Sequence, residues 1–250
     1  MEKALGIDIS VYDYDPKGIV KVNFEMIRDY PVHFIAIRAA ISWGYVDKWF
    51  RYGWEEAAAK KINRIAYHVP YFGEPTLKQM DNLFGAVHGS NWDHDILCLD
   101  CELVHANTKE QITAATRSMM EICKSRTGKY PILYSRALWV NENMIVSALP
   151  GETEWWLAQY LYKVKYPAYT AEHKGPPTLP KGVKSWLIHQ TAEAAPGIGT
   201  YSYYCDWNRW NGDAEAVNKY FGVKTEIVIP SIEERLSRLE EWIEKHENNS

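Results

Sequence analysis

The stretch Ile96-Leu-Cys-Leu-Asp-Cys-Glu-Leu103 decides how the rest of the chain is interpreted. Its length, its apolar content and its lack of Gly and Pro are typical of a β-strand buried on both faces. It nevertheless carries two acids, Asp100 and Glu102, which share one face because side chains alternate along a strand. Burying an unpaired carboxylate is costly. The two acids are therefore either ion-paired at a strand end or engaged in acid/base chemistry, where one keeps its proton because its neighbour is charged.

Strands and helices alternate on both sides of this stretch. The pattern predicts strands at Leu5–Ser10, Phe34–Ala40, Arg64–Pro70, Ile96–Leu103, Tyr130–Ser135, Glu154–Tyr160, Ser185–Gln190 and Tyr203–Asp206. It predicts helices at Asn23–Tyr30, Lys48–Lys61, Thr76–Val87, Thr108–Arg126, Leu138–Leu149 and Asn211–Phe221. This order favours an α/β fold with a parallel sheet and, at 250 residues, an irregular (β/α) barrel of the TIM type with a short C-terminal helical tail.

We expect a barrel domain at residues 1–222, followed by a linker and an amphipathic helix at residues 223–250. Ser231 and Glu234 have the spacing of a helix-capping box. The apolar seam of this helix consists of Ile232, Leu236, Leu239 and Ile243. A seam of about two heptads is marginal as a free coiled coil, so the helix either docks on the barrel or joins two copies of the chain through residues 231–246.

The alternation stops between Leu161 and Lys184, where four prolines occur and no helical pattern is present. A segment of this length without secondary structure predicts a functional or surface loop. It is long enough to reshape one rim of a cleft.

Composition narrows the class of partner. The formal net charge is -4 and the basic residues are scattered, so neither nucleic acid nor an anionic membrane is an expected partner. No segment approaches the roughly 18 apolar residues of a membrane span, and the first residues lack the apolar core of a signal peptide. We therefore expect a protein that is made in the cytoplasm, without membrane insertion.

The cysteines do not form a metal-binding pattern. Cys98 and Cys101 spell C-x-x-C, but on a strand they face opposite ways, and no second pair or suitably spaced His completes a zinc set. We expect these two, Cys123 and Cys205 to be reduced core thiols. No metal and no organic cofactor is predicted.

The aromatic residues favour rings with a polar group, since 11 Trp and 17 Tyr stand against 6 Phe. Such rings suit a cleft that stacks on sugar faces and bonds their hydroxyls. The alternative for any one of them is simple core packing.

Four stretches together carry a family resemblance: Gly6–Ser10, Leu99–Glu102, Trp186–Gln190 and Cys205–Gly212. In this order and at these separations they resemble glycoside hydrolase family 25, the Chalaropsis-type lysozymes found among bacterial, fungal and phage muramidases. The resemblance covers about residues 5–221, with further matches at Ala66–His68, Gly128–Tyr134 and Trp156–Tyr160.

The resemblance implies cleavage of the β-1,4 bond between N-acetylmuramic acid and N-acetylglucosamine in peptidoglycan, with catalytic acids at Asp8, Asp100, Glu102 and Asp206. Glycosidic cleavage requires a proton on the leaving oxygen and negative charge near the sugar. We assign Glu102 as general acid, because repulsion from Asp100 and Asp8 favours its protonated form. Asp100 is expected to stay ionised, and either to orient the 2-acetamido group of the substrate or to act on water. Asp8 and Asp206 position and tune this pair, or else make structural hydrogen bonds at strand ends.

Weaker candidates for sugar contacts are Tyr67, Tyr134, Trp156 and Gln190. His68 fits a core histidine as well as a ligand contact, and His189 fits a structural role. The chain departs from the family after the second strand, where Arg38–Gly44 has no acid and the next one is Asp47. This departure concerns the subsites on the glycone side.

Two alternatives compete with a lysozyme. One is a non-catalytic glycan-binding or virion structural module on the same barrel. The other is a chitinase-like enzyme, but its D-x-x-D-x-D-x-E motif is absent, since only Leu97-Cys-Leu precedes Asp100. For the lysozyme we expect an endolysin that reaches the cell wall through a holin-type pore, or a component of a virion.

Overall fold

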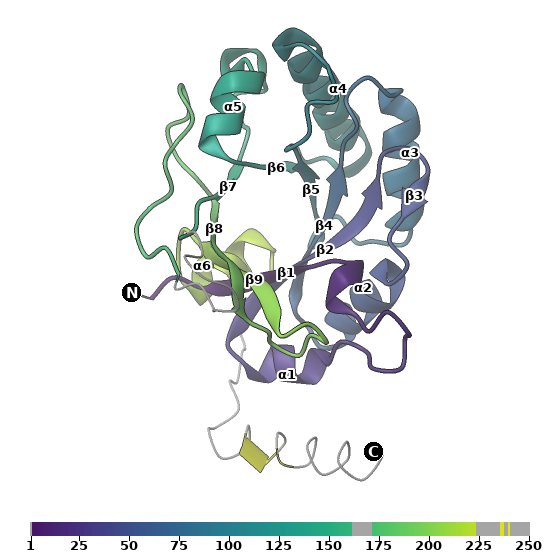
Figure 1. Cartoon of the computed structure of the whole chain (residues 1–250), viewed down its shortest axis with the longest axis vertical. Coiled ribbons are helices and arrows are strands. Elements are labelled where there is room, and N and C mark those ends of the chain that lie inside the picture. The colour runs from purple at the N-terminus through teal and green to yellow at the C-terminus, as the bar shows by residue number, and fades with distance from the viewer. Residues whose placement is uncertain (1, 162–171, 224–235, 238–239, 241–250) are drawn as a thin grey trace.

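A computed structural model describes residues 2–161, 172–223, 236–237 and 240 of the chain (Figure 1). Its strands are β1 (Leu5–Ile9), β2 (Val32–Ile41), β3 (Tyr45–Val46), β4 (Asn63–Val69), β5 (Ile96–Asp100), β6 (Ile132–Ser135), β7 (Trp155–Ala158), β8 (Ile188–Pro196) and β9 (Tyr204–Trp210). Its α-helices are α1 (Phe24–Asp29), α2 (Phe50–Ala59), α3 (Thr76–Ala86), α4 (Lys109–Thr127), α5 (Ala137–Asn143) and α6 (Ala214–Tyr220). Single 3-10 turns lie at Val11–Asp13 and Val146–Ala148.

The sheet closes on itself and confirms the predicted barrel (Figure 1). Its strands follow one another in the order β1-β9-β8-β7-β6-β5-β4-β2, and a parallel pairing of β1 with β2 completes the ring. The neighbours from β2 through β8 are also parallel, whereas β9 runs antiparallel to both β8 and β1. Because parallel strands end at the same mouth of a barrel, side chains at their carboxyl ends converge there.

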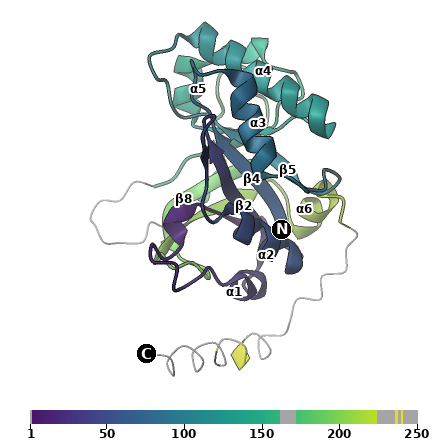
Figure 2. The same ribbon diagram turned by 90° about the vertical axis from the view of Figure 1, so that its right-hand side faces the viewer.

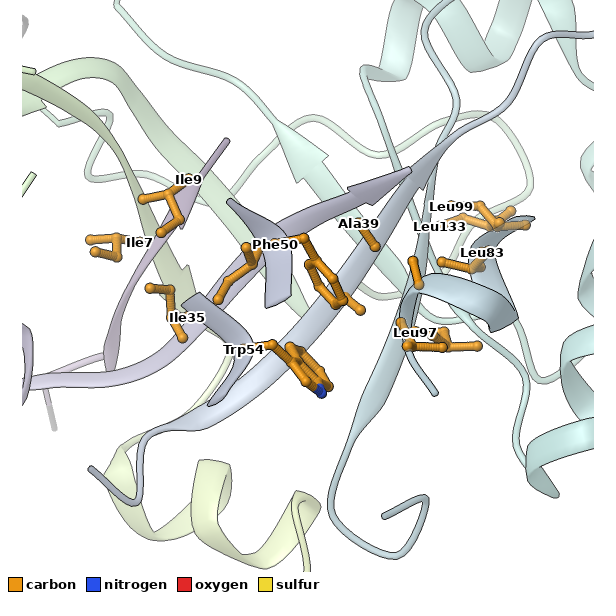
Figure 3. Close-up of a cluster of buried hydrophobic side chains, with 14 of the residues drawn as sticks. Ile7, Ile9, Ile35, Ala39, Phe50, Trp54, Leu83, Leu97, Leu99 and Leu133 are labelled. Atoms are coloured by element: carbon orange, nitrogen blue, oxygen red, sulfur yellow. The ribbon is translucent and has the colours of Figure 1, made fainter. Parts of the chain in front are cut away.

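An outer core fills the space between the barrel and its helices. Its side chains include Ile7, Ile9, Ile35, Phe50, Trp54, Leu83, Leu97, Leu99 and Leu133 (Figure 3). The helices α3 and α4 lie side by side on one flank of the barrel (Figure 2). Helix α4 is the predicted long helix, with a capping box at Thr108 and a left-handed Gly128 directly after its end.

An inner core fills the barrel itself. It contains Phe34, Ala36, Ile65, Ile96, Ile132, Ile188 and Trp210, together with Val217 of α6 and Phe221 directly after that helix. The first six of these residues come from the amino-terminal half of the parallel strands, and Trp210, the last residue of the antiparallel β9, pairs with Ile188 at the same end. Apolar side chains therefore close that end. The polar residues of the interior are left at the opposite mouth.

The thiols follow the strand alternation. Cys98 belongs to the inner core and Cys101 to the outer core, as expected of positions three apart on an extended chain. All four cysteines are buried and free, which confirms the prediction of reduced core thiols.

Strand β5 ends earlier than predicted. Asp100 is its last residue, paired with Tyr134 of β6, whereas we predicted a strand to Leu103. Glu102 therefore stands in the loop after the strand. That loop cannot continue the pleat, because His105 and Ala106 have φ angles of 45° and 57°.

The second half of the chain also differs from the prediction. Strand β8 continues past Gln190 to Pro196, and β9 continues past Asp206 to Trp210, so that the two form a long antiparallel hairpin. The predicted helix at Leu138–Leu149 is only α5, because Met144 is extended (φ -133°, ψ 144°). The two-residue strand β3 was not predicted at all. The helix predicted at Asn211–Phe221 begins at Ala214 rather than at Asn211.

Two predictions fall on residues outside the described ranges. The linker and C-terminal helix at 223–250 lie almost entirely there, and so does the middle of the predicted loop at 161–184. The described end of that loop is anchored by Glu172, whose carboxylate accepts two hydrogen bonds from Arg209 of β9, each of 2.8 Å.

Candidate active site

One cavity of about 220 Å³ at the carboxyl ends of the parallel strands brings together every site residue that the sequence predicted. It is lined by Asp8, Tyr67, Cys98, Asp100, Glu102, Tyr134, Arg136, Trp156, Tyr160, Gln190, Glu193 and Asp206. The two acids of the deciding stretch are joined there by acids from the first and last strands of the barrel.

Strand register explains how the acids meet. Asp8 on β1 lies directly opposite Asp206 on the antiparallel β9. Side chains of residues paired in this way lie on one face of the sheet, about 5 Å apart at their Cβ atoms. Asp100 and Glu102 approach from β5, across the barrel from this pair. The acids thus reach one space from opposite walls.

A hydrogen-bonded amide links the acids of β1 and β9. The side-chain nitrogen of Gln190 donates to Asp8 Oδ2 at 3.0 Å and to Asp206 Oδ2 at 3.2 Å. Tyr134 donates its hydroxyl to the amide oxygen of Gln190 at 2.8 Å, which fixes which way the amide points. Gln190 therefore holds the two carboxyls together and is itself oriented by Tyr134.

Asn208 supports Asp8 from a second side. Its side-chain nitrogen donates to Asp8 Oδ2 at 2.8 Å, and its oxygen accepts the indole N–H of Trp156 at 2.8 Å. Trp156 and Asn208 are 2% and 0% exposed. The indole of Trp156 thus takes part in holding the acids in place, a role that the sequence did not predict for it.

Burial controls the protonation of these acids. Burial raises the pKa of Asp8 to about 6, opposed by the hydrogen bonds from Asn208 and Gln190. Burial, followed by the charge of Asp8, raises the pKa of Asp206 well above its usual value. The free protein therefore keeps protons in this cluster at pH values where exposed aspartates are ionised.

Asp100 differs from our expectation. Burial, and then the charges of Glu102 and Asp8, raise the pKa of Asp100 well above its usual value, only partly offset by Arg38 and Arg136. We expected it to be the ionised member of the pair. Its strand places it deeper in the protein than Glu102, and desolvation there favours the neutral form.

Two oxygens facing this space have unused hydrogen-bonding capacity. Oδ1 of Asp100 and Oε1 of Glu102 are buried and accept no hydrogen bond from the described residues. Buried polar atoms are nearly always hydrogen-bonded in folded proteins. These two atoms are therefore suited to bonding a substrate.

The cavity also holds three residues that sequence reasoning missed: Arg136, Tyr160 and Glu193. Arg136 directly follows β6, Tyr160 comes two residues after β7, and Glu193 lies in the unpredicted half of β8. The signal that could have found the first two is their place just beyond the carboxyl end of a barrel strand.

The first acid after the second strand, Asp47, has a structural role. Asp47 is buried, and its carboxylate accepts a hydrogen bond of 3.0 Å from Nε of Arg38. It also accepts the backbone N–H of Val11 at 3.0 Å. Asp47 thus stabilises the loop after β1 and does not line the cavity.

The two histidines do not contribute to the cavity. His68 and His189 are 0% and 1% exposed, and burial lowers the pKa of each to about 4. Both therefore stay neutral near pH 7. Within the described ranges, no helix has the length and apolar composition to cross a membrane. In the same ranges, no cluster of His, Cys, Asp and Glu side chains has an arrangement that could hold a metal ion.

The comparison with protein families decides the classification. The model for "Glycosyl hydrolases family 25" matches residues 7–196, which contain the β-strands that carry Asp8 and Asp100. The chain belongs to glycosyl hydrolase family 25. The family match ends before Asp206, which β9 brings to the cavity.

Relatives of this family 25 chain include both sequences and solved structures. The uncharacterized protein YegX of Escherichia coli O6:H1 is 28% identical over 159 residues. The match covers 62% of this chain and 56% of YegX, so the chain spans about half the length of the curated relatives it matches.

Two solved structures show that the fold is shared. A bacterial lysozyme from Streptomyces coelicolor superimposes with a TM-score of 0.71 at 19% identity, covering 90% of this chain and 100% of that one. The catalytic domain of endolysin ply40, from bacteriophage P40 of Listeria monocytogenes, gives a TM-score of 0.65 at 16% identity. It covers 88% of this chain and 98% of that domain.

Proposed function

We propose that this chain is a peptidoglycan hydrolase, an N-acetylmuramidase that cleaves the β-1,4 bond between N-acetylmuramic acid and N-acetylglucosamine. The observation that carries the proposal is the convergence of Asp8, Asp100, Glu102 and Asp206 on one cavity at the carboxyl mouth of a family 25 barrel. Lysozymes and an endolysin among the similar structures support the substrate class.

Glu102 is proposed to deliver the proton. Its side chain is 32% exposed, whereas Asp100 lies deeper, so Glu102 is the acid that a polysaccharide in the cavity reaches. Its Oε1 accepts no hydrogen bond from the described residues and is suited to bonding the glycosidic oxygen. Protonation of that oxygen as the bond breaks is the role of a general acid.

Asp100 is proposed to act as the base of the pair. Because its pKa is raised, its ionised form binds a proton more strongly than an exposed aspartate does. It would accept the N–H of the 2-acetamido group of the substrate, or the proton of an attacking water. The anomeric configuration of the first product, followed by NMR, distinguishes the two, because substrate-assisted attack retains the configuration and direct attack by water inverts it.

The remaining candidates support this pair. Asp8 and Asp206 are proposed to position and tune the two catalytic acids. We propose that Tyr67, Tyr134, Trp156 and Gln190 line the subsites, with Gln190 also holding Asp8 and Asp206.

A turbidity assay on purified cell walls tests the proposal. The parent protein should clear the walls, and Glu102→Gln should lower the rate by about 10²–10⁴-fold, because an amide cannot donate the proton. Matching thermal unfolding of the two proteins excludes misfolding as the cause. Equal clearing by the variant would remove Glu102 from its role.

Product analysis then separates a muramidase from a glucosaminidase, since the two leave different sugars at the reducing end. We expect N-acetylmuramic acid there. Binding to walls without any clearing by the parent would instead favour the non-catalytic glycan-binding or virion module.

We propose peptidoglycan of the cell wall as the place of action. Release through a holin-type pore and transport within a virion are both compatible with this substrate. The fold shared with the phage endolysin supports a lytic role.

A further inference from the structure

A row of polar side chains along one wall of the cavity joins Glu102 to three residues that have no role in the mechanism above. It runs from Glu102 after β5 through Arg136 after β6 and Tyr160 after β7 to Glu193 in β8, and all four residues line the cavity. Successive parallel strands present them in this order, so neighbours in the row come from neighbouring strands.

Arg136 lies at the centre of the row. Its Nε is 3.6 Å from Oε1 of Glu102, a distance of ionic contact but too long for a hydrogen bond. Its Nη2 donates to the hydroxyl of Tyr160, and its guanidinium carbon lies 5.3 Å from the centre of the Tyr160 ring. Arg136 is thus attached to Tyr160 and presents its charge to Glu102.

Tyr160 gives this arginine a rigid support. The tyrosine is only 9% exposed and its ring belongs to the inner core of the barrel, whereas the side chain of Arg136 is 46% exposed. The Tyr160 hydroxyl also hydrogen-bonds Glu193, which helps to raise the pKa of Tyr160, behind the larger effect of burial. The hydroxyl therefore donates to Glu193 while it accepts from Arg136.

Glu102 is surrounded by acids and tyrosines, and Arg136 adds a positive charge to this group. Asp8 and Asp206 face it from β1 and β9, and Asp100 ends its own strand β5; each has its pKa raised in part by the charge of Glu102. Tyr134 of β6 and Tyr160 after β7 face it as well. Among the described residues, Arg136 forms an ion pair with Glu102, and it does so without occupying Oε1 with a hydrogen bond.

We propose that Arg136 is a positioning residue for Glu102, held in place by Tyr160, which aligns the general acid and favours release of its proton to the leaving oxygen. The inference rests on the proposed function. A cation beside the acid stabilises the carboxylate that forms when the proton passes to the leaving oxygen. The 3.6 Å spacing leaves the reactive oxygen for the substrate.

Arg136→Gln tests the charge. We expect the alkaline limb of the pH profile of kcat/KM to move up by about half a pH unit, the shift being small because the pair is partly exposed. We expect kcat to fall about tenfold through loss of alignment. Arg136→Lys, which keeps the charge, should hold the pH profile nearer to that of the parent.

Arg126→Gln is the matched control. It removes the same charge from the end of α4, where Arg126 pairs with Asp81 at 2.7 Å on the outer surface. It should leave the profile unchanged. A profile for Arg136→Gln that superimposes on that of the parent would overturn the inference.

Tyr160→Phe tests the support. If Tyr160 acts through Arg136, the loss of kcat/KM on removing its hydroxyl should be several-fold in the parent and nearly absent in Arg136→Gln. Equal losses in both backgrounds would contradict the proposed linkage. An inactive parent would overturn the proposed function and this inference together, whereas an active parent with additive losses overturns this inference alone.

Discussion

At the scale of single residues, the protein keeps acids buried that would be ionised in water. Asp8, Asp100 and Asp206 each have a raised pKa, and in each case burial is the largest cause. Folding therefore keeps these carboxyls protonated at pH values at which they are ionised in the unfolded chain. Burying these three acids lowers the stability of the folded chain, and such perturbed pKa values are typical of catalytic sites.

Asp13, which lies outside the catalytic cavity, allows the effect of a buried acid on the free energy of unfolding to be measured. Burial raises its pKa to about 7, and its carboxylate accepts the backbone N–H of Ser10 at 2.8 Å. The stability it contributes is present below the pKa of the unfolded chain and is lost as pH rises through about 7. Asn lacks this dependence and keeps an oxygen to accept the hydrogen bond.

We therefore expect the free energy of unfolding of the parent, relative to Asp13→Asn, to fall by up to a few kcal/mol between pH 4 and pH 8. Urea unfolding at several pH values measures it. His68 and His189 act in the opposite direction, since burial lowers the pKa of each, but they are the same in both proteins and cancel. A difference independent of pH would show that Asp13 is ionised in the folded state.

At the scale of elements, the sequence predicted the barrel strands because they are short, apolar and bounded by turns. The candidate site began with Asp100 and Glu102 at the end of one such strand, and the family resemblance added Asp8 and Asp206. The predicted ends of several strands were wrong. Periodicity does not show where a ladder stops, so β5 was extended to Leu103 although its last pairing is Asp100 with Tyr134.

The missed features depend on contacts distant in sequence. The long hairpin of β8 and β9 is stabilised by pairing between its two strands, which a local pattern does not contain. Arg136 and Tyr160 follow strands in segments without periodicity, and only the pairing of β5 with β6 and of β6 with β7 brings them to Glu102. Glu193 was missed because the predicted strand ended at Gln190, whereas β8 continues to Pro196.

The contact between β1 and β2 carries a prediction of its own. A Cβ added to Gly6 would lie 2.3 Å from Cζ of Phe34, whose ring fills the inner core. We expect Gly6→Ala to lower the free energy of unfolding by about 1–3 kcal/mol through overpacking. Adding Phe34→Leu should restore part of it, a coupling that a double-mutant cycle in urea would measure.

Gly85→Ala is the control for this prediction. It makes the same substitution in α3, where no atom lies within 4 Å of the added Cβ. Because alanine favours helix, it should raise stability by up to about 1 kcal/mol. A Gly6→Ala protein as stable as the parent would mean that the Phe34 ring moves aside without cost.

At the scale of the whole molecule, two hydrophobic cores stabilise different parts of the barrel. The inner core and α6 fill the amino end of the barrel, and the outer core holds the helices against its surface. Carboxyls, amides and Arg136 are left at the open mouth. Stability and chemistry thus occupy opposite ends of the same strands.

This division predicts how the chain tolerates truncation. We propose that residues 1–222 form the catalytic unit, since every cavity residue lies between Asp8 and Asp206 and the inner core is closed by Phe221. A chain ending at Val223 should clear purified cell walls at a rate within about twofold of the full chain, because it keeps every residue of the cavity and of the inner core. Light scattering on both proteins gives their masses. A full chain that is dimeric and a shortened one that is monomeric would assign self-association to the removed segment, whereas equal oligomeric states would exclude it. Loss of clearing in a shortened protein that still unfolds cooperatively would show that the active unit extends beyond the barrel.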